Sequence, residues 1–248
     1  MTGTNKNIVC IIPARGGSKA IPKKNIKMLG GHPLVTYSIA AAKLSSLIEN
    51  VIVTTDSEEI AEICRNYGAD VPFLRPAEIS RDNSVDIEFL QHYIDYCISV
   101  NVEPPEYMVH FSPTVPFREP IQIDKGITEI IENPEATSLR SVYLSGTSPY
   151  KVFNMEGPYL KGFFPEYHVK EYYNMPRQTF PETFIPTGVV DVVRTSTINN
   201  GSLHGDKMIG FKTDYVPNID TFDDFDLAVE ALDDKRFEPI LQYLKNYE

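Results

Sequence analysis

Three short apolar runs, rich in β-branched side chains, constrain this 248-residue chain most strongly. They span Ile8 to Ile12, Val51 to Thr54 and Tyr107 to Phe111. Runs of this length and composition are typical of strands that are buried on both faces of a parallel sheet. The first half of the chain is therefore predicted to contain at least three such strands.

Helical signals separate these strands. Asp56 followed by Glu59 resembles a capping box, and Gly68 is suited to end the helix that this box begins. Ile87, Leu90, Ile94 and Cys97 recur with helical spacing. Further helices are predicted from Pro33 to Ala42 and from Ile121 to Ile131. Strands alternating with helices indicate an α/β fold, Rossmann-like, with a mostly parallel sheet sandwiched by helices.

The pattern changes after about residue 137. Strands are predicted at Ser141–Leu144, Lys151–Asn154 and Val189–Val193, and helices at Phe222–Leu232 and Pro239–Tyr247. No linker or internal repeat divides the chain, so residues 1–248 are predicted to form one domain. Residues 145–183 are dense in Tyr, Phe and Pro. They are interpreted either as a subdomain with its own small core or as an excursion that contacts a second subunit, and the two are compatible.

Composition excludes several classes of function. A net charge of −11 argues against binding to nucleic acid or to an anionic membrane surface. No apolar run approaches the roughly 18 to 20 residues that a membrane span needs, and the N-terminus does not resemble a secretion signal. The three cysteines, Cys10, Cys64 and Cys97, are widely spaced and fit free thiols in a reducing cytoplasm.

The loop after the first strand carries the strongest functional signal, because open α/β sheets bind ligands at this position. Gly16 and Gly17 allow backbone N–H groups to approach an anion. Several cationic and neutral donors accompany them: Arg15, Ser18, Lys19, Lys23, Lys24 and Asn25. This is what a triphosphate requires. The loop is neither a Walker loop nor a dinucleotide fingerprint, and taken alone it also fits a solvated basic turn.

The stretch Ile12-Pro-Ala-Arg-Gly-Gly-Ser-Lys-Ala-Ile-Pro-Lys-Lys-Asn25 resembles the signature of the CMP-sialic acid synthetases, the acylneuraminate cytidylyltransferases. Phe111-Ser-Pro-Thr-Val-Pro-Phe-Arg118 is similar to the family's QPTSPLR. Pro176 to Gly188 is similar to its PRQxxPxxFxxNG, and Asn218 to Phe225 to its DIDTxxDF. The matches follow the family's order over about residues 8 to 232. The resemblance implies a nucleotide-diphospho-sugar transferase-like fold, a homodimer, and transfer of CMP from CTP to an acidic sugar.

For the nucleotide, the resemblance implies that Arg15, Ser18, Lys19 and Lys24 hold the triphosphate, with Gly16, Gly17 and Asn25 beside them. It places Arg75 next to the cytosine, and Asp82, Asn83 and Ser84 in the loop that completes the base pocket. An ion pair at the surface is the alternative interpretation of Arg75.

For the acceptor, the resemblance implies that Lys151, Arg177 and Gln178 face the sugar. An arginine fork suits a carboxylate, although Arg177 also fits a purely structural role in its loop. Asp220 matches a family magnesium ligand. Mg²⁺ would neutralise the charge that develops when the sugar hydroxyl attacks the α-phosphorus and pyrophosphate leaves. Arg15, Lys24 and Asp220 are therefore the predicted catalytic residues.

The departures from the family pattern cluster at the sugar end. Ser112, Ile185, Thr187 and Asp191 replace family residues there, and Asn218 replaces the first aspartate of DID. We therefore expect the family's nucleotide donor with a different acidic acceptor, and a metal site at Asp220 and Asn218 that is altered or supplemented. Another base or acceptor, such as a sugar phosphate, and a non-catalytic nucleotide-binding homologue stay open as alternatives.

Overall fold

The computed structural model describes residues 7–18 and 20–247. A six-stranded sheet has the order β10-β6-β9-β5-β1-β4. Its strands are β1 (Ile8–Pro13), β4 (Asn50–Thr54), β5 (Tyr107–His110), β6 (Ser138–Leu144), β9 (Phe184–Arg194) and β10 (Met208–Lys212). Of these six strands, β9 alone runs antiparallel to its neighbours. The expected α/β fold with a mostly parallel sheet is confirmed.

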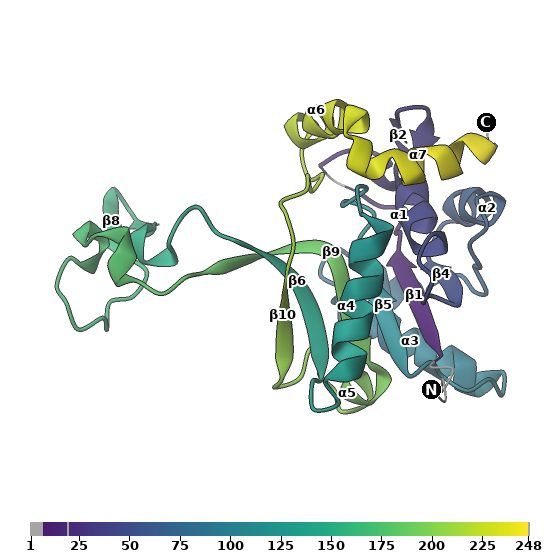
Figure 1. Ribbon diagram of the computed structural model, residues 1–248, viewed down its shortest axis with the longest axis horizontal. Coiled ribbons are helices and arrows are strands. Elements are labelled where there is room, and N and C mark those ends of the chain that lie inside the picture. Colours follow the sequence, from purple (N-terminus) through teal and green to yellow (C-terminus); the bar gives the residue numbers. More distant parts are fainter. Residues whose placement is uncertain (1–6, 19, 248) are drawn as a thin grey trace.

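Helices cover both faces of the sheet (Figure 1). On one face lie α1 (Leu34–Lys43), α2 (Glu58–Asn66), α4 (Pro120–Glu132), α6 (Phe222–Glu230) and α7 (Glu238–Leu244), and on the other α3 (Asp86–Ser99) and α5 (Thr195–Asn199). The side chains of β1 point alternately to the two faces of the sheet, and this explains why helices pack on both faces. Ile8, Cys10 and Ile12 enter the larger apolar core, whereas Val9 and Ile11 enter the core under α3. Ile8 to Ile12 are therefore all buried, as a central strand requires.

Several local predictions needed correction. The residue that caps α2 is Ser57, whose Oγ accepts from the backbone N of Ile60, and not Asp56. Residues 149–151 form a 3-10 turn rather than the start of a strand, and the strand there is β7 (Phe153–Glu156). The strand predicted at Val189–Val193 is the longer β9. The short pair β2 (Met28–Leu29) and β3 (His32–Pro33) and the edge strand β10 were not predicted.

Residues 145–183 project from the body as an arm (Figure 1). The ends of β6 and β9 pair as far as Leu144 and Phe184 and so form its base. The arm contains a hairpin of β7 and β8 (Tyr159–Gly162). Its aromatic side chains pack on one another: Tyr150 stacks on Phe180 with a centroid separation of 4.8 Å, and Tyr172 is buried. The arm therefore has a small aromatic core, while its pairing with a second subunit stays a prediction.

Candidate active site

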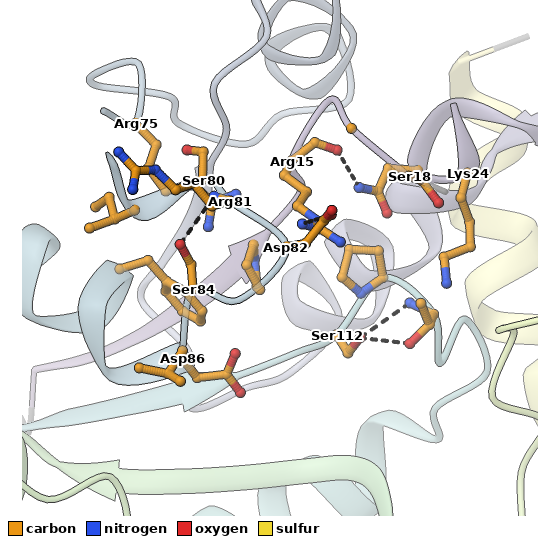
Figure 2. Close-up of a pocket in the computed structure, with 18 residues that line it drawn as sticks. Arg15, Ser18, Lys24, Arg75, Ser80, Arg81, Asp82, Ser84, Asp86 and Ser112 are labelled. Carbon is orange, nitrogen blue, oxygen red and sulfur yellow. Dashed lines mark hydrogen bonds and ion pairs between the residues drawn. The ribbon is translucent and has the colours of Figure 1, made fainter. Parts of the chain in front are cut away.

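A pocket of about 280 Å³ lies where β1 ends (Figure 2). Three loops line it: the loop after β1, the loop before α3 and the loop after β5. It brings together eight residues that the sequence predicts for nucleotide binding, namely Arg15, Gly17, Ser18, Lys24, Asn25, Arg75, Asp82 and Ser84. Ser80, Arg81, Asp86 and Thr114 also line it and were not predicted. This cavity is called the nucleotide pocket below.

Backbone contacts fix the loop after β1. The side-chain Nδ2 of Asn25 donates to the backbone carbonyl of Arg15 at 2.9 Å, and the backbone N of Gly16 donates to Oδ1 of Asp56 at 2.7 Å. A Cβ at Gly16 would lie 3.2 Å from Cβ of Ser57, so the close approach favours glycine. Sequence reasoning missed this role of Asp56. Its place directly after β4 was the available signal, because parallel strands bring their carboxyl ends to one edge.

Two ion pairs place opposite charges around this pocket. Nη1 of Arg15 lies 2.8 Å from Oδ1 of Asp82, and both side chains are partly exposed (Figure 2). Nζ of Lys24 lies 3.0 Å from Oδ1 of Asp220 and also donates to the carbonyl of Ile219 at 2.9 Å. A bound triphosphate would compete with Asp82 and Asp220 for these cations, because phosphate oxygens are strong acceptors for both side-chain types.

Arg75 is the most unusual cation of the nucleotide pocket. The residue is only 6% exposed, and its Nε and Nη2 atoms have no hydrogen-bond partner among the residues that the structure describes. Burial lowers the pKa of its guanidinium, and the nearby charge of Asp56 opposes that shift. Leaving such donors unpaired is costly. The arrangement is that of a group preorganised for a ligand and not that of the surface ion pair considered above.

A second cavity of about 360 Å³ adjoins the first and shares Pro13, Asp86, Ser112 and Thr114 with it. Its lining includes Thr187, Asp191 and Asn218, all of which the sequence assigns to the sugar end. His110 and Arg140 also line it and were not predicted. We call this cavity the acceptor pocket. Together the two pockets would allow two substrates to meet at a shared wall.

Arg118 holds that wall in place. It is fully buried and donates to the carbonyls of Ser112, Val115, Gly188 and Val189 and to Oγ of Ser38. Burial lowers the pKa of the guanidinium. Arg118 thus ties the loop after β5 to the bulged start of β9. Although it ends a family-like motif, the sequence did not reveal that its partners are backbone carbonyls.

Some predicted residues lie elsewhere. Lys151, Arg177 and Gln178 belong to the arm and do not line the acceptor pocket. Nζ of Lys151 donates to the carbonyl of Tyr173 at 3.3 Å, and Nη2 of Arg177 to that of Ser145 at 2.7 Å. Asn83 is exposed beside the nucleotide pocket without lining it. Lys19 lies outside the described residues.

The predicted metal ligands are adjacent. Nδ2 of Asn218 donates to Oδ2 of Asp220 at 2.9 Å, and the side chain of Asp220 is 63% exposed. Within residues 7–18 and 20–247, no three His, Cys, Asp or Glu side chains gather as a metal cluster. Mg²⁺ takes one or two protein carboxylates and completes its shell with waters and substrate phosphates. An accessible carboxylate that pairs with Lys24 of the loop after β1 therefore fits that ion.

The part of the chain that the structure describes also contains no helix that is long and apolar enough to cross a membrane.

The described geometry has counterparts among solved structures. CMP:2-keto-3-deoxy-manno-octonic acid synthetase complexed with CTP superposes with a TM-score of 0.69 at 14% identity, over 92% of this chain and 98% of that one. The 4-diphosphocytidyl-2C-methyl-D-erythritol synthase of Anaerococcus prevotii has a TM-score of 0.58 at 15% identity, over 92% and 99% of the two chains. At these identities the likeness concerns the fold.

Curated relatives are similar in sequence. The N-acylneuraminate cytidylyltransferase of Escherichia coli is 42% identical over 124 residues, which are 48% of this chain and 27% of that protein. The CMP-N,N'-diacetyllegionaminic acid synthase of Legionella pneumophila is 38% identical over 46% of this chain and 48% of its own. A pseudaminic acid cytidylyltransferase of Campylobacter jejuni is 45% identical over 39% of this chain and 41% of its own. The chain thus spans half or less of the length of these relatives.

A family profile described as cytidylyltransferase matches residues 9–156, more than half of the chain. The match includes the loop after β1, the loop before α3 and the family-like motif that ends at Arg118. The family resemblance found in the sequence is confirmed, and the chain belongs to the cytidylyltransferase family.

Proposed function

We propose that this protein transfers CMP from CTP to the anomeric hydroxyl of an acidic, sialic-acid-like 2-keto sugar and releases pyrophosphate. The observation that carries the proposal is the pair of adjoining pockets. One has a basic glycine loop at the end of β1, and the other has a polar lining on β5, β6 and β9. The curated relatives are named for the same kind of reaction on acylneuraminic, legionaminic and pseudaminic acids.

The chain's own residues have separate roles in this proposal. Arg15, Ser18 and Lys24 bind the triphosphate, and Arg75 directs its unpaired donors at the base. Lys24 leaves Asp220 when the nucleotide binds and neutralises charge on the transferred phosphoryl group. The shared wall at Ser112 brings the acceptor hydroxyl toward that group.

We also propose that Mg²⁺ is required, held by Asp220 with Asn218 beside it. When bound, the ion would neutralise negative charge on the phosphate oxygens. Asp220 offers the carboxylate for it. One of its oxygens lies next to Lys24, and among the described residues the other accepts only from the neutral amide of Asn218.

The proposed working form is a cytoplasmic homodimer. Apolar side chains of the arm are exposed in the single chain, with Met155 at 68%, Tyr159 at 72% and Leu160 at 60%. A second subunit would remove this surface from water. Cys10, Cys64 and Cys97 are free and buried, which suits a reducing compartment. Light scattering tests the assembly, and a monomer at working concentrations would contradict it.

The decisive experiment measures pyrophosphate release for each of the four NTPs against N-acetylneuraminate, N,N'-diacetyllegionaminic acid, pseudaminic acid and 2-keto-3-deoxy-manno-octonate. We expect CTP to be preferred. N-acetylneuraminate should be a poor acceptor, because Ser112, Thr187 and Asp191 line the pocket where the family carries other groups. Release with a sugar phosphate alone would favour the alternative acceptor class. No release with any pair would favour a non-catalytic homologue.

A further inference from the structure

A row of three polar residues crosses the floor of the acceptor pocket. His110 on β5 and Arg140 on β6 are both in direct register with Asp191 on β9. Directly paired residues of adjacent strands project on the same face of a sheet. All three line the acceptor pocket, and Asp86 faces the row at its His110 end, with Oδ2 3.8 Å from Nδ1 of the histidine.

Arg140 is held on two sides. Its Nε forms an ion pair with Oδ2 of Asp191 at 3.3 Å, without the geometry of a hydrogen bond. Oδ1 of Asp191 in turn accepts from the backbone N of Ser141 at 3.1 Å and from its Oγ at 3.3 Å. Its Nη1 lies 3.5 Å from Nε2 of His204. Burial and the charge of Arg140 lower the pKa of His204, which favours the neutral ring, and Nε2 of a neutral ring can accept a hydrogen bond from Arg140. Among the described residues, none hydrogen-bonds Nη2 of Arg140, and the side chain is 37% exposed.

An acidic acceptor needs such a cation. A carboxylate that enters a partly enclosed pocket loses water and must regain charge-assisted hydrogen bonds. Among the described residues, the cations that line the nucleotide pocket are Arg15, Lys24, Arg75 and Arg81, which the triphosphate and base would occupy. Among the described residues, Arg140 is the only lysine or arginine that lines the acceptor pocket. Lys151 and Arg177 are engaged with carbonyls of the arm.

We propose that Arg140 binds the carboxylate of the acidic acceptor, presenting the Nη2 edge of a guanidinium that Asp191 and His204 orient. The inference rests on the proposed function and adds to it the residue that makes an acid the preferred acceptor. Asp86 and His110 lie at the other end of the row, where they offer partners for neutral hydroxyl or amide groups of the same sugar.

The test compares an acid with its methyl ester. Pseudaminic acid, N,N'-diacetyllegionaminic acid and N-acetylneuraminate are each assayed with saturating CTP, alongside their esters, for wild type, Arg140→Gln and Arg177→Gln. We expect Arg140→Gln to raise the acceptor KM about ten-fold or more, as the loss of a charge-assisted contact does. The KM for CTP should stay within two-fold. The acid-to-ester ratio of kcat/KM should fall by the same factor, which a merely structural role would not produce.

Arg140→Lys keeps the charge without the planar fork and should show a smaller rise. If Arg140→Gln fails to fold, Arg140→Lys takes its place in the test. An acid-to-ester ratio of kcat/KM equal to that of wild type in Arg140→Lys would then overturn the inference. An unchanged ratio in folded Arg140→Gln, or a loss of the ratio in Arg177→Gln alone, would overturn it and place the carboxylate site in the arm. Wild-type protein that releases no pyrophosphate with any acid would overturn the proposed function itself, and the inference with it.

Discussion

Lys24 and Asp220 form an ion pair of 3.0 Å although 196 residues separate them in the chain. Lys24 follows the first strand, and Asp220 lies just before α6. The pair joins the predicted triphosphate loop to the predicted metal ligand. The side chain of Lys24 is 13% exposed and that of Asp220 is 63% exposed, so the carboxylate is the more accessible partner. In the proposed function, binding of the nucleotide with Mg²⁺ would separate this ion pair, giving Lys24 a phosphate partner and Asp220 a metal partner.

Asp220→Asn should reduce kcat by roughly a hundred-fold or more, because losing a metal-held charge at a phosphoryl-transfer site costs several kcal/mol of barrier. Asp223→Asn is the matched control, since Asp223 lies in the first turn of α6 and lines neither pocket. Steady-state pyrophosphate release at saturating CTP and Mg²⁺ measures both. Full activity in Asp220→Asn would show that the metal is held elsewhere.

Asn218→Asp should be tolerated and should lower the Mg²⁺ concentration needed for half-maximal activity. The neutral amide now donates to Asp220. A second carboxylate would repel Asp220 without a cation and attract a divalent ion with it. A titration of Mg²⁺ in the presence of CTP, followed by thermal unfolding, gives a readout that is independent of turnover. A higher Mg²⁺ requirement than that of wild type would contradict the assignment.

Arg15→Gln should weaken CTP binding or turnover about ten-fold or more, since a charge-assisted contact contributes roughly 1.5 to 3 kcal/mol. Lys23→Gln is the control from the same loop. Nζ of Lys23 pairs with Glu59 at 2.8 Å and Lys23 does not line the nucleotide pocket. Calorimetric titration with CTP compares the two. Equal affinity in both variants would remove Arg15 from the triphosphate site.

Arg118→Met should lower the free energy of unfolding by about 3 to 5 kcal/mol, because it leaves buried carbonyls without donors. The folded fraction should also lose activity, since the variant releases Ser112 and Gly188 from each other. Arg65→Met is the control, as Arg65 pairs with Glu58 at the surface and should cost less than about 1 kcal/mol. Urea unfolding measures both, and equal losses would contradict the positioning role.

Acidification below about pH 6.5 should destabilise the protein through His204. Burial, with Arg140 adding to it, lowers the pKa of His204 in the folded state, so the unfolded chain binds more protons there. The contribution of His204 to the free energy of unfolding is therefore fully present above the pKa of His204 in the unfolded chain. It is lost as the pH drops toward the lower pKa of His204 in the folded protein. Urea unfolding at pH 7.5 and 5.5 should show a smaller loss in His204→Gln. Some loss remains, because burial also lowers the pKa of His92.

The sequence alone determined the inner strands, the helices between them and the family. Its signals are local: β-branched runs, helical spacing and the loop from Arg15 to Asn25 each act over a few residues. The nucleotide pocket was largely predictable for the same reason, since strand ends of a parallel sheet converge. Of β9, the sequence predicted only Val189–Val193. Its full length and antiparallel direction were not predicted, because they depend on partners more than 40 residues away, such as Arg140 for Asp191.

Only the tertiary structure shows which side chains line the acceptor pocket, whose role stays a proposal. In the sequence, Asp191 is a departure from the family pattern within an apolar strand. In the structure, the register of β9 pairs it with His110 on one side and with Arg140 on the other. The sequence does not show which groups Arg118 and Arg177 contact, and the sugar role predicted for Arg177 stays a prediction. Their partners are carbonyls from distant loops in the first case and from the base of the arm in the second. Hydrogen-bond partners of this kind depend on which distant segments meet in space, and local sequence patterns do not predict which segments meet.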